Sequence, residues 1–389
     1  MKYYITNIKL VTETGIIWDG AVLTEDDRIL YAGENTAIPA ALTEGAEPVD
    51  GENLYLGPGF VDIHNHGVET WSFDEKPYEA AEYFLRHGET TVLPTFYMTL
   101  PREGFLHSIE LVKEAMAKGD LVSQAIGGFY MEGPYMNPNY GADRRFNAWG
   151  TTCIPEEYQA VVDAAGDLVK VWACDPEREG IEEFMKYAKK VNPDVMFACG
   201  HCEAMPASVR RLKRLGMGIQ THCTNATGVQ HHKNACEGIK GVGPNEADWL
   251  DDDMYAEMIS DSLAIHVHPD MQKLIIKIKG VDRVVLITDS TPNDGPNPPE
   301  YAHVTDLNFD RDGSLSGSKI TLNTACRNVM HHTRCGITEC FLMASRNPAR
   351  VIGIDADYGT VEAGKKADLV FVTDDFTVKK VMKSGQFVS

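Results

Sequence analysis

The feature that most constrains the fold is a regular alternation of apolar runs and amphipathic stretches between residues 58 and 350. The apolar runs are short and bounded by glycine, proline or polar residues, which is typical of buried strands. They fall at residues 60–63, 91–94, 125–130, 169–172, 195–198, 218–220, 264–267 and 284–287. Helical patterns lie between them, for example at residues 79–87, 108–117, 182–190 and 207–215.

Strands that alternate with helices predict a parallel sheet, because two parallel strands need a long crossover connection. About eight such units in roughly 290 residues favour a closed TIM-type (β/α)8 barrel over an open doubly wound sheet. Neither a G-x-G-x-x-G turn nor a Walker loop occurs in the sequence. We therefore expect an α/β protein whose barrel comprises residues 58–354.

The two ends of the chain have a different pattern from the middle. Short β-type runs occur through residues 1–57 and return at residues 368–372, 378–381 and 387–388. Two β-rich ends around a different middle predict one domain built from both termini. We expect residues 1–57 and 355–389 to form a small β-sandwich domain.

Imidazole and carboxylate side chains stand at the ends of the predicted barrel strands. His64 and His66 follow the first apolar run with one residue between them, so both can project to the same side. The other members of the set each close an apolar or glycine-bounded run: Glu132, His201, His222 and Asp289. The carboxyl ends of all barrel strands open on one face, so these groups can converge. Such ligands suit zinc, iron or manganese, and the set predicts a metal-dependent hydrolase.

The segments around these residues resemble one family in particular. In chain order they are residues 58–67 (PGFVDIHNHG), 131–134 (MEGP), 200–201, 221–226 (THCTNA), 266–269 (HVHP), 288–289, 315–318, 345–349 (SRNPA) and 364–369. Together they are similar to the N-acetylglucosamine-6-phosphate deacetylase branch of the amidohydrolase superfamily. The segments occur in the family's order over nearly the whole chain.

The resemblance implies a role for each residue at the strand ends. A primary metal would be held by Glu132, His201 and His222. A second metal would be held by His64 and His66, with Glu132 bridging, although some family members lack this pair and use one metal. Asp289 would be the base that activates water and then the acid that protonates the departing amine. The resemblance thus implies one or two divalent metals per subunit, zinc in the first place and iron or manganese as alternatives.

The resemblance also implies a substrate, N-acetylglucosamine 6-phosphate, which would be hydrolysed to glucosamine 6-phosphate and acetate. Asn225 and Ala226 would meet the sugar phosphate, and His266 would contact the sugar. The acetyl group would lie near Leu315, Ser316 and Gly317. The family's phosphate site is often shared across a dimer interface, so the expected form is a homodimer.

Two positions depart from the family pattern and keep alternatives open. Asp143 stands where the family commonly has a histidine that polarises the substrate carbonyl, and Lys233 stands where it has a phosphate-binding arginine. A carboxylate cannot donate to an oxyanion unless it is protonated, so either Arg144 or Arg145 takes that role, the metal acts alone, or the substrate differs. Lysine binds phosphate without the bidentate fork of arginine. The alternatives are a deacetylase of another N-acyl amino sugar, such as N-acetylgalactosamine 6-phosphate or a non-phosphorylated sugar, and a non-catalytic barrel that binds acetylated sugars.

Composition limits the kinds of binding partner and the cellular compartment that we expect for this protein. The formal net charge of -21 argues against nucleic acid and against an anionic membrane surface. The sequence contains neither a signal-peptide pattern nor a membrane-spanning run. The cysteine count of nine is odd, which favours a reduced cytoplasm over a disulfide framework. Cys199 and Cys202 form a C-x-x-C motif, but His201 between them is better used as a ligand, and we interpret these thiols as buried.

Overall fold

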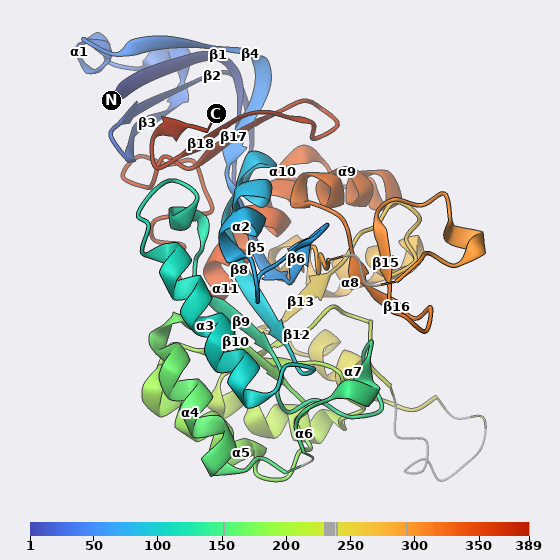
Figure 1. The fold of residues 1–389 in the computed structure, drawn as a ribbon. Coiled ribbons are helices and arrows are strands. Elements are labelled where there is room, and N and C mark those ends of the chain that lie inside the picture. Colours follow the sequence, from blue (N-terminus) through green and yellow to red (C-terminus); the bar gives the residue numbers. More distant parts are fainter. Residues whose placement is uncertain (151, 229–237, 239, 293–294, 389) are drawn as a thin grey trace.

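Eight parallel strands form the centre of the large domain in the computed structural model, which describes residues 1–150, 152–228, 238, 240–292 and 295–388. The strands are β5 (Phe60–Asn65), β8 (Glu89–Tyr97), β9 (Phe129–Glu132), β10 (Val169–Cys174), β11 (Met196–Cys199), β12 (Met217–Gln220), β13 (Tyr255–Met258) and β14 (Val284–Leu286). They follow one another in the sheet in chain order. The predicted (β/α)8 barrel is confirmed (Figure 1).

The barrel closes between β5 and the residues that follow β14. The backbone N–H of Asp289 donates to the carbonyl of His64 at 2.9 Å, and that of His66 donates to the carbonyl of Ser290 at 2.8 Å. A parallel bridge between Asn65 and Ser290 lies at the same place. The first histidine pair and the predicted base are therefore joined by main-chain hydrogen bonds.

One predicted strand, at residues 264–267, is wrong. The seventh barrel strand is β13, about nine residues earlier, and residues 265–267 form bends. Asp261 explains the difference, because its carboxylate accepts the backbone N–H groups of Leu263, Ile265 and His266 at 2.9–3.1 Å. These donors are thereby turned away from a strand ladder. The strand predicted at residues 125–130 is shifted, because Ser123–Ala125 forms a 3-10 turn before β9 begins.

Helices cover the outside of the barrel. They are α2 (Pro77–Arg86), α3 (Arg102–Met116), α4 (Pro155–Ala165), α5 (Ile181–Val191), α6 (Pro206–Leu212), α7 (Pro244–Trp249), α8 (Pro269–Lys279), α9 (Leu322–Thr333), α10 (Ile337–Phe341) and α11 (Asn347–Val351). Several start with proline, whose fixed φ suits the first helical turn. Within the described ranges, no helix is both long and apolar enough to cross a lipid bilayer.

Helix α5 illustrates how the sequence pattern becomes packing. Its apolar residues recur at helical spacing, and the buried members are Ile181, Phe184, Met185 and Ala188. Acidic residues stand in its first turn and lysines in its last turn, which complements the helix dipole. The buried face packs into a cluster with Trp172 and Phe197 from the barrel strands. Burial of these side chains against the sheet fixes the strand ends that carry the site.

Both chain ends build the small domain, which forms one seven-stranded sheet in the order β19-β18-β17-β4-β1-β2-β3. Its strands are β1 (Lys2–Thr12), β2 (Gly15–Glu25), β3 (Arg28–Glu34), β4 (Glu47–Pro58), β17 (Leu369–Val372), β18 (Val378–Lys383) and β19 (Gln386–Phe387). The sheet curls over one core, because Ile29 of β3 exchanges backbone hydrogen bonds with Gly364 and Lys365, shortly before β17. The expected small β domain from both termini is confirmed (Figure 1), and its residue limits stay a prediction.

Two hairpins extend from the barrel beside the strand ends. One pairs β6 (Gly67–Val68) with β7 (Trp71–Ser72), and the other pairs β15 (Leu307–Phe309) with β16 (Leu315–Ser318). Ser318 reaches the strand-end region, since its backbone N–H donates to the carbonyl of Asp289 at 2.8 Å. Gly317 has a φ of 63°, and a Cβ there would lie 2.4 Å from the Asp289 carbonyl oxygen. The close approach of this hairpin to Asp289 therefore requires glycine.

Candidate metal centre

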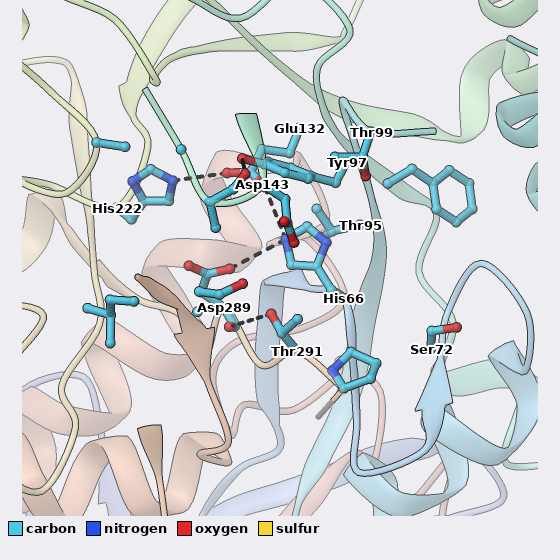
Figure 2. A pocket seen from close by; sticks show the side chains of 18 of the residues that line it. His66, Ser72, Thr95, Tyr97, Thr99, Glu132, Asp143, His222, Asp289 and Thr291 are labelled. Carbon is cyan, nitrogen blue, oxygen red and sulfur yellow. Dashed lines mark hydrogen bonds and ion pairs between the residues drawn. The ribbon is translucent and has the colours of Figure 1, made fainter. Parts of the chain in front are cut away.

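A cavity of about 710 Å³ opens at the carboxyl ends of the barrel strands. Its size is ordinary for a small-molecule site. Imidazole and carboxylate groups from different strands line it, and Figure 2 shows His66, Glu132, His222 and Asp289 pointing toward one another. The convergence expected of the strand ends is thus present in the structure.

Glu132, at the end of β9, lies between two groups of histidines. Its Oε1 is 2.7 Å from Nε2 of His201 and 2.9 Å from Nε2 of His222. Its Oε2 is 3.0 Å from Nε2 of His66 and 3.5 Å from Nε2 of His64. Each carboxylate oxygen therefore faces one histidine pair, which is the arrangement needed for a carboxylate shared between two cations.

These side chains form two compact sets of possible ligands. One comprises Glu132, His201 and His222, and the other comprises His64, His66, Glu132 and Asp289. The Nε2 atoms of His201 and His222 lie only 3.0 Å apart. At this distance the two nitrogens either share a proton or direct both lone pairs at one cation, and the spacing fits two imidazoles on the same metal.

The outer nitrogens of two of these histidines have acceptors that set their tautomers. Nδ1 of His222 lies 3.2 Å from the carbonyl oxygen of Asn225, and Nδ1 of His64 lies 3.2 Å from Oε2 of Glu257. When Nδ1 donates to such an acceptor, Nε2 keeps its lone pair for a metal. The tautomers of these two histidines, like the short distances between the side chains, therefore fit a divalent cation.

Asp289 follows β14 and lies against the second set. Its Oδ1 is 3.4 Å from Nε2 of His66 and 3.7 Å from Nε2 of His64. Thr291 donates its hydroxyl to the Asp289 carbonyl oxygen at 3.3 Å. The carboxylate is nearly buried, with 8% of the residue exposed, so the site can hold a proton away from bulk water.

Opposing charges keep the two carboxylates ionised. Burial works to raise the pKa of Glu132, but His64 and His201 outweigh it and hold that pKa well below its usual range. Burial also works to raise the pKa of Asp289. The hydrogen bond from His66 and the charge of His64 outweigh it, so the pKa of Asp289 is lowered. Against the cost of burial, Asp289 and Glu132 raise the pKa of His66 to about 9. The cluster is therefore built to hold positive charge.

Left-handed backbone occurs at several of these residues. φ is 46° at His201, 25° at His222 and 47° at Asp289. Such conformations are uncommon for residues other than glycine and cluster at functional sites. Here they turn the chain sharply as each strand ends, so that the side chain points into the cavity.

The residues expected to contact substrate line the same cavity. Those in the described part of the chain are Asp143, Asn225, Ala226, His266, Leu315, Ser316 and Gly317. The amide of Asn225 donates to the carbonyl oxygen of His266 at 2.9 Å. His266 is held between Asp261 and the hairpin, with Nδ1 3.0 Å from Asp261 Oδ2 and Nε2 3.1 Å from the Gly317 carbonyl oxygen. Lys233 lies outside the described residues.

Asp143 lines the cavity from a loop that is tied to the β15–β16 hairpin. Its backbone N–H donates to Asp310 Oδ2 at 3.3 Å, and the neighbouring Arg145 forms an ion pair with Asp312 at 2.6 Å. Burial and the charge of Asp310 raise the pKa of the Asp143 carboxyl. Asp143, which departs from the family pattern, thus faces the site, and the loop with Asp310 and Asp312 positions it.

Two side chains of the site were not found from the sequence. Tyr97 of β8 lines the cavity, donates its hydroxyl to the Ala142 carbonyl oxygen at 3.0 Å, and packs against His66 and His201. Glu257 of β13 is fully buried behind His64. The signal for Glu257 in the sequence is a charged residue within the apolar run 254–259, but the run at residues 264–267 predicts the seventh strand in another place.

The fold and the cluster together are those of a barrel hydrolase with a metal-binding site. The chain belongs to the amidohydrolase family, whose family model matches residues 55–388. Relatives agree with this placement. N-acetylglucosamine-6-phosphate deacetylase of Bacillus subtilis is 28% identical, over 96% of this chain and 94% of that protein. N-acetylgalactosamine-6-phosphate deacetylase of Escherichia coli O157:H7 is also 28% identical, over 100% of both chains.

Solved structures share the fold over the full length. N-acetylglucosamine-6-phosphate deacetylase from Pasteurella multocida has a TM-score of 0.85 at 23% identity and covers 100% of both chains. A mutant of the Mycobacterium smegmatis enzyme, in complex with N-acetyl-D-glucosamine-6-phosphate, has a TM-score of 0.82 at 25% identity and covers 99% of both chains. The resemblance drawn from the sequence segments is confirmed.

Proposed function

We propose that this protein is a metal-dependent deacetylase that hydrolyses N-acetylglucosamine 6-phosphate to glucosamine 6-phosphate and acetate. The observation that carries the proposal is the division of Glu132 between two histidine pairs, with Asp289 beside one of them. Its full-length relatives include deacetylases of N-acetylated sugar phosphates. A barrel that only binds sugars has no use for an intact base and an intact ligand set.

The metal assignment follows the two sets of side chains. Glu132, His201 and His222 would hold the primary metal, and His64 and His66 a second one with Glu132 shared. The mixed imidazole and carboxylate donors support zinc in the first place, with iron or manganese as alternatives. When bound, the metal supplies a Lewis acid that polarises the acetyl carbonyl and lowers the pKa of water.

Proton transfer falls to Asp289. Its ionised carboxylate accepts a proton from the water that attacks the acetyl carbon, and this proton is then given to the sugar nitrogen as the carbon–nitrogen bond breaks. The immediate products are acetic acid and the free amine, and transfer of the acid proton to the amine gives acetate and the ammonium form, so atoms and charge balance without any further reactant. The position of Oδ1, 3.4 Å from His66 Nε2, keeps the carboxylate at the edge of the ligand set.

Substrate orientation would come from other residues that line the cavity. Asn225 and Ala226 would meet the sugar phosphate, together with Lys233, and His266 would contact the sugar ring. The acetyl group would lie near Leu315, Ser316 and Gly317, on the hairpin that approaches Asp289. Asp143 would accept a hydrogen bond from a sugar hydroxyl, because an ionised carboxylate has no proton to donate.

A second candidate substrate is N-acetylgalactosamine 6-phosphate. It is favoured by the Escherichia coli O157:H7 relative, which matches over both full lengths. Asp143 supports the same alternative, since a changed residue at the cavity wall alters contacts with sugar hydroxyls. The chemistry at the acetyl group is the same in both cases.

The test is a comparison of deacetylation rates on metal-analysed protein. N-acetylglucosamine and N-acetylgalactosamine are assayed with and without the 6-phosphate, and released amine is quantified. The proposal predicts the highest kcat/KM for N-acetylglucosamine 6-phosphate. Equal rates with and without phosphate would remove the phosphate from the proposal, and a preference for the galactose epimer would select the second candidate.

We further propose that the enzyme acts in the cytoplasm as a homodimer. The cysteines in the described part of the chain are free thiols, which supports a reducing compartment. The dimer is supported by the resemblance to a family whose phosphate site is often shared between subunits. Light scattering coupled to size-exclusion chromatography tests it, with a mass near twice 43.0 kDa as the expected result.

A further inference from the structure

Glu257 is a buried carboxylate that the proposed reaction does not use. It lies on β13, has 0% of its surface exposed, and projects toward the centre of the barrel behind the histidines. A carboxylate in such a place is costly unless its oxygens receive hydrogen bonds. Its contacts therefore indicate what it does.

One oxygen of Glu257 receives three hydrogen bonds from the ligand region. Oε2 lies 3.2 Å from Nδ1 of His64 and accepts the backbone N–H of His222 at 3.2 Å. It also accepts the hydroxyl of Tyr130 at 3.4 Å. The same oxygen thus contacts one member of each proposed metal set.

Tyr130 completes the support of His64. Its ring packs on the imidazole with centroids 4.3 Å apart, and its hydroxyl lies 3.1 Å from the Thr221 hydroxyl. His64 is held by a ring on its face and a carboxylate at Nδ1, and only Nε2 is directed at Glu132 and Asp289. The imidazole therefore has one usable orientation and one usable tautomer.

We infer that Glu257 is the positioning residue that fixes His64 for the second metal and so decides whether that metal is retained. This inference rests on the proposed metal ligands of the deacetylase and deepens them. A carboxylate that accepts from Nδ1–H keeps the proton off Nε2 and increases its basicity toward a cation. His66 has no role in this contact, so the effect is transmitted through His64.

The effect on the primary metal is smaller. Glu257 reaches His222 only through its backbone N–H, while the His222 imidazole is oriented by the Asn225 carbonyl oxygen at 3.2 Å. The side-chain tautomer of His222 therefore does not depend on Glu257. Loss of Glu257 should release the second metal first.

The experiment measures zinc binding and needs no substrate. Wild type, Glu257→Leu and Glu257→Gln are stripped with a chelator and titrated with Zn²⁺ in competition with a fluorescent zinc indicator, and bound zinc is counted by mass spectrometry. The expected result is two equivalents in wild type. Glu257→Leu should keep the first and bind the second about 10–100-fold more weakly, the range for loss of an outer partner. Glu257→Gln, whose amide oxygen can still accept, should fall between them.

Glu89→Gln is the matched control. Glu89 on β8 is also fully buried, and it accepts the backbone N–H of Leu322 at 2.7 Å instead of contacting a histidine. It should bind both zinc equivalents as wild type does. If Glu257→Leu does not fold, as judged by circular dichroism and thermal melting, the comparison of Glu257→Gln with Glu89→Gln carries the test.

A His64→Gln background separates positioning from a general loss of structure. In that background the second equivalent is already lost, and adding Glu257→Gln should leave the affinity of the remaining equivalent unchanged. A further loss there would show that Glu257 acts through His222 and would overturn the inference. Wild-type affinity for the second equivalent in both Glu257 variants, or a wild type that binds one equivalent, would overturn it as well. Because sugar is absent, failure of the proposed substrate would leave these results unaffected.

Discussion

The carboxylate of Asp289 lies 3.4 Å from Nε2 of His66, and its backbone is hydrogen-bonded to His64. The proposed base is therefore built into the same strand-end turn as the second ligand pair. This contact explains why one residue can stay ionised in a nearly buried position, since neighbouring imidazoles lower its pKa.

Asp289→Asn should separate metal binding from turnover. Asparagine has nearly the same shape but cannot accept the proton of water, so kcat should fall by about 10²–10⁴-fold. Zinc content should stay at the wild-type value, because the proposed ligands are unchanged. Steady-state kinetics on metal-analysed protein check this, and near-normal turnover would reject Asp289 as the base.

The two histidine groups should differ in their effect on metal content. His66→Gln should remove one equivalent of zinc and leave Glu132, His201 and His222 to hold the other. His201→Gln should remove the primary metal and turnover with it, because two ligands remain. Elemental analysis with parallel assays distinguishes the variants; equal zinc content in wild type and His66→Gln would show that His66 is not a ligand.

Asp143→Asn tests the role of the cavity residue that replaces the family's histidine. Asparagine tolerates the φ of 48° at this position, so the loop should be preserved. If Asp143 accepts from a sugar hydroxyl, KM should rise by about tenfold, the loss of one hydrogen bond to a charged group, with kcat little changed. Separate determination of kcat and KM is the measurement. A large fall in kcat would instead assign Asp143 to the chemical step.

Lys233→Ala should weaken the binding of the phosphorylated sugar and leave the binding of the non-phosphorylated sugar unchanged. A charge-assisted contact contributes about 1.5–3 kcal/mol, so KM for the 6-phosphate should rise by about 10–100-fold. KM for the non-phosphorylated sugar should not change, and Lys233→Arg should retain the phosphate preference. An equal effect on both sugars would mean that Lys233 does not bind phosphate.

Asp261 should contribute stability that depends on pH. Burial opposes it, but the hydrogen bond and charge of His266 and two backbone N–H groups lower the pKa of Asp261 from 3.8 to about 2. A lowered pKa means stability that is present above pH 4 and lost as the pH falls toward 2, about 2 kcal/mol in all. Asp261→Asn should melt lower than wild type at pH 7, and the gap should narrow at pH 3. A gap that is independent of pH would contradict the assignment.

Much of the barrel could be predicted because most strands are continuous apolar runs, and the ligands follow them directly. His64 and His66 were found from their alternation at the end of β5. The seventh strand was missed because Glu257 interrupts its apolar run, whereas residues 264–267 are apolar except for His266 but are held out of a strand by Asp261. Contacts between distant segments, such as Glu257 with His64, have no local pattern in the sequence.

The central claim is hydrolysis of an N-acetyl group by the cluster around Glu132. The direct measurement is proton NMR of the zinc-loaded protein with N-acetylglucosamine 6-phosphate, following acetate and glucosamine 6-phosphate over time. The account predicts that the two products appear in equal amounts, and that they do not appear with the chelator-stripped protein or with Asp289→Asn. Binding of the sugar phosphate to the zinc-loaded protein without release of acetate would contradict it.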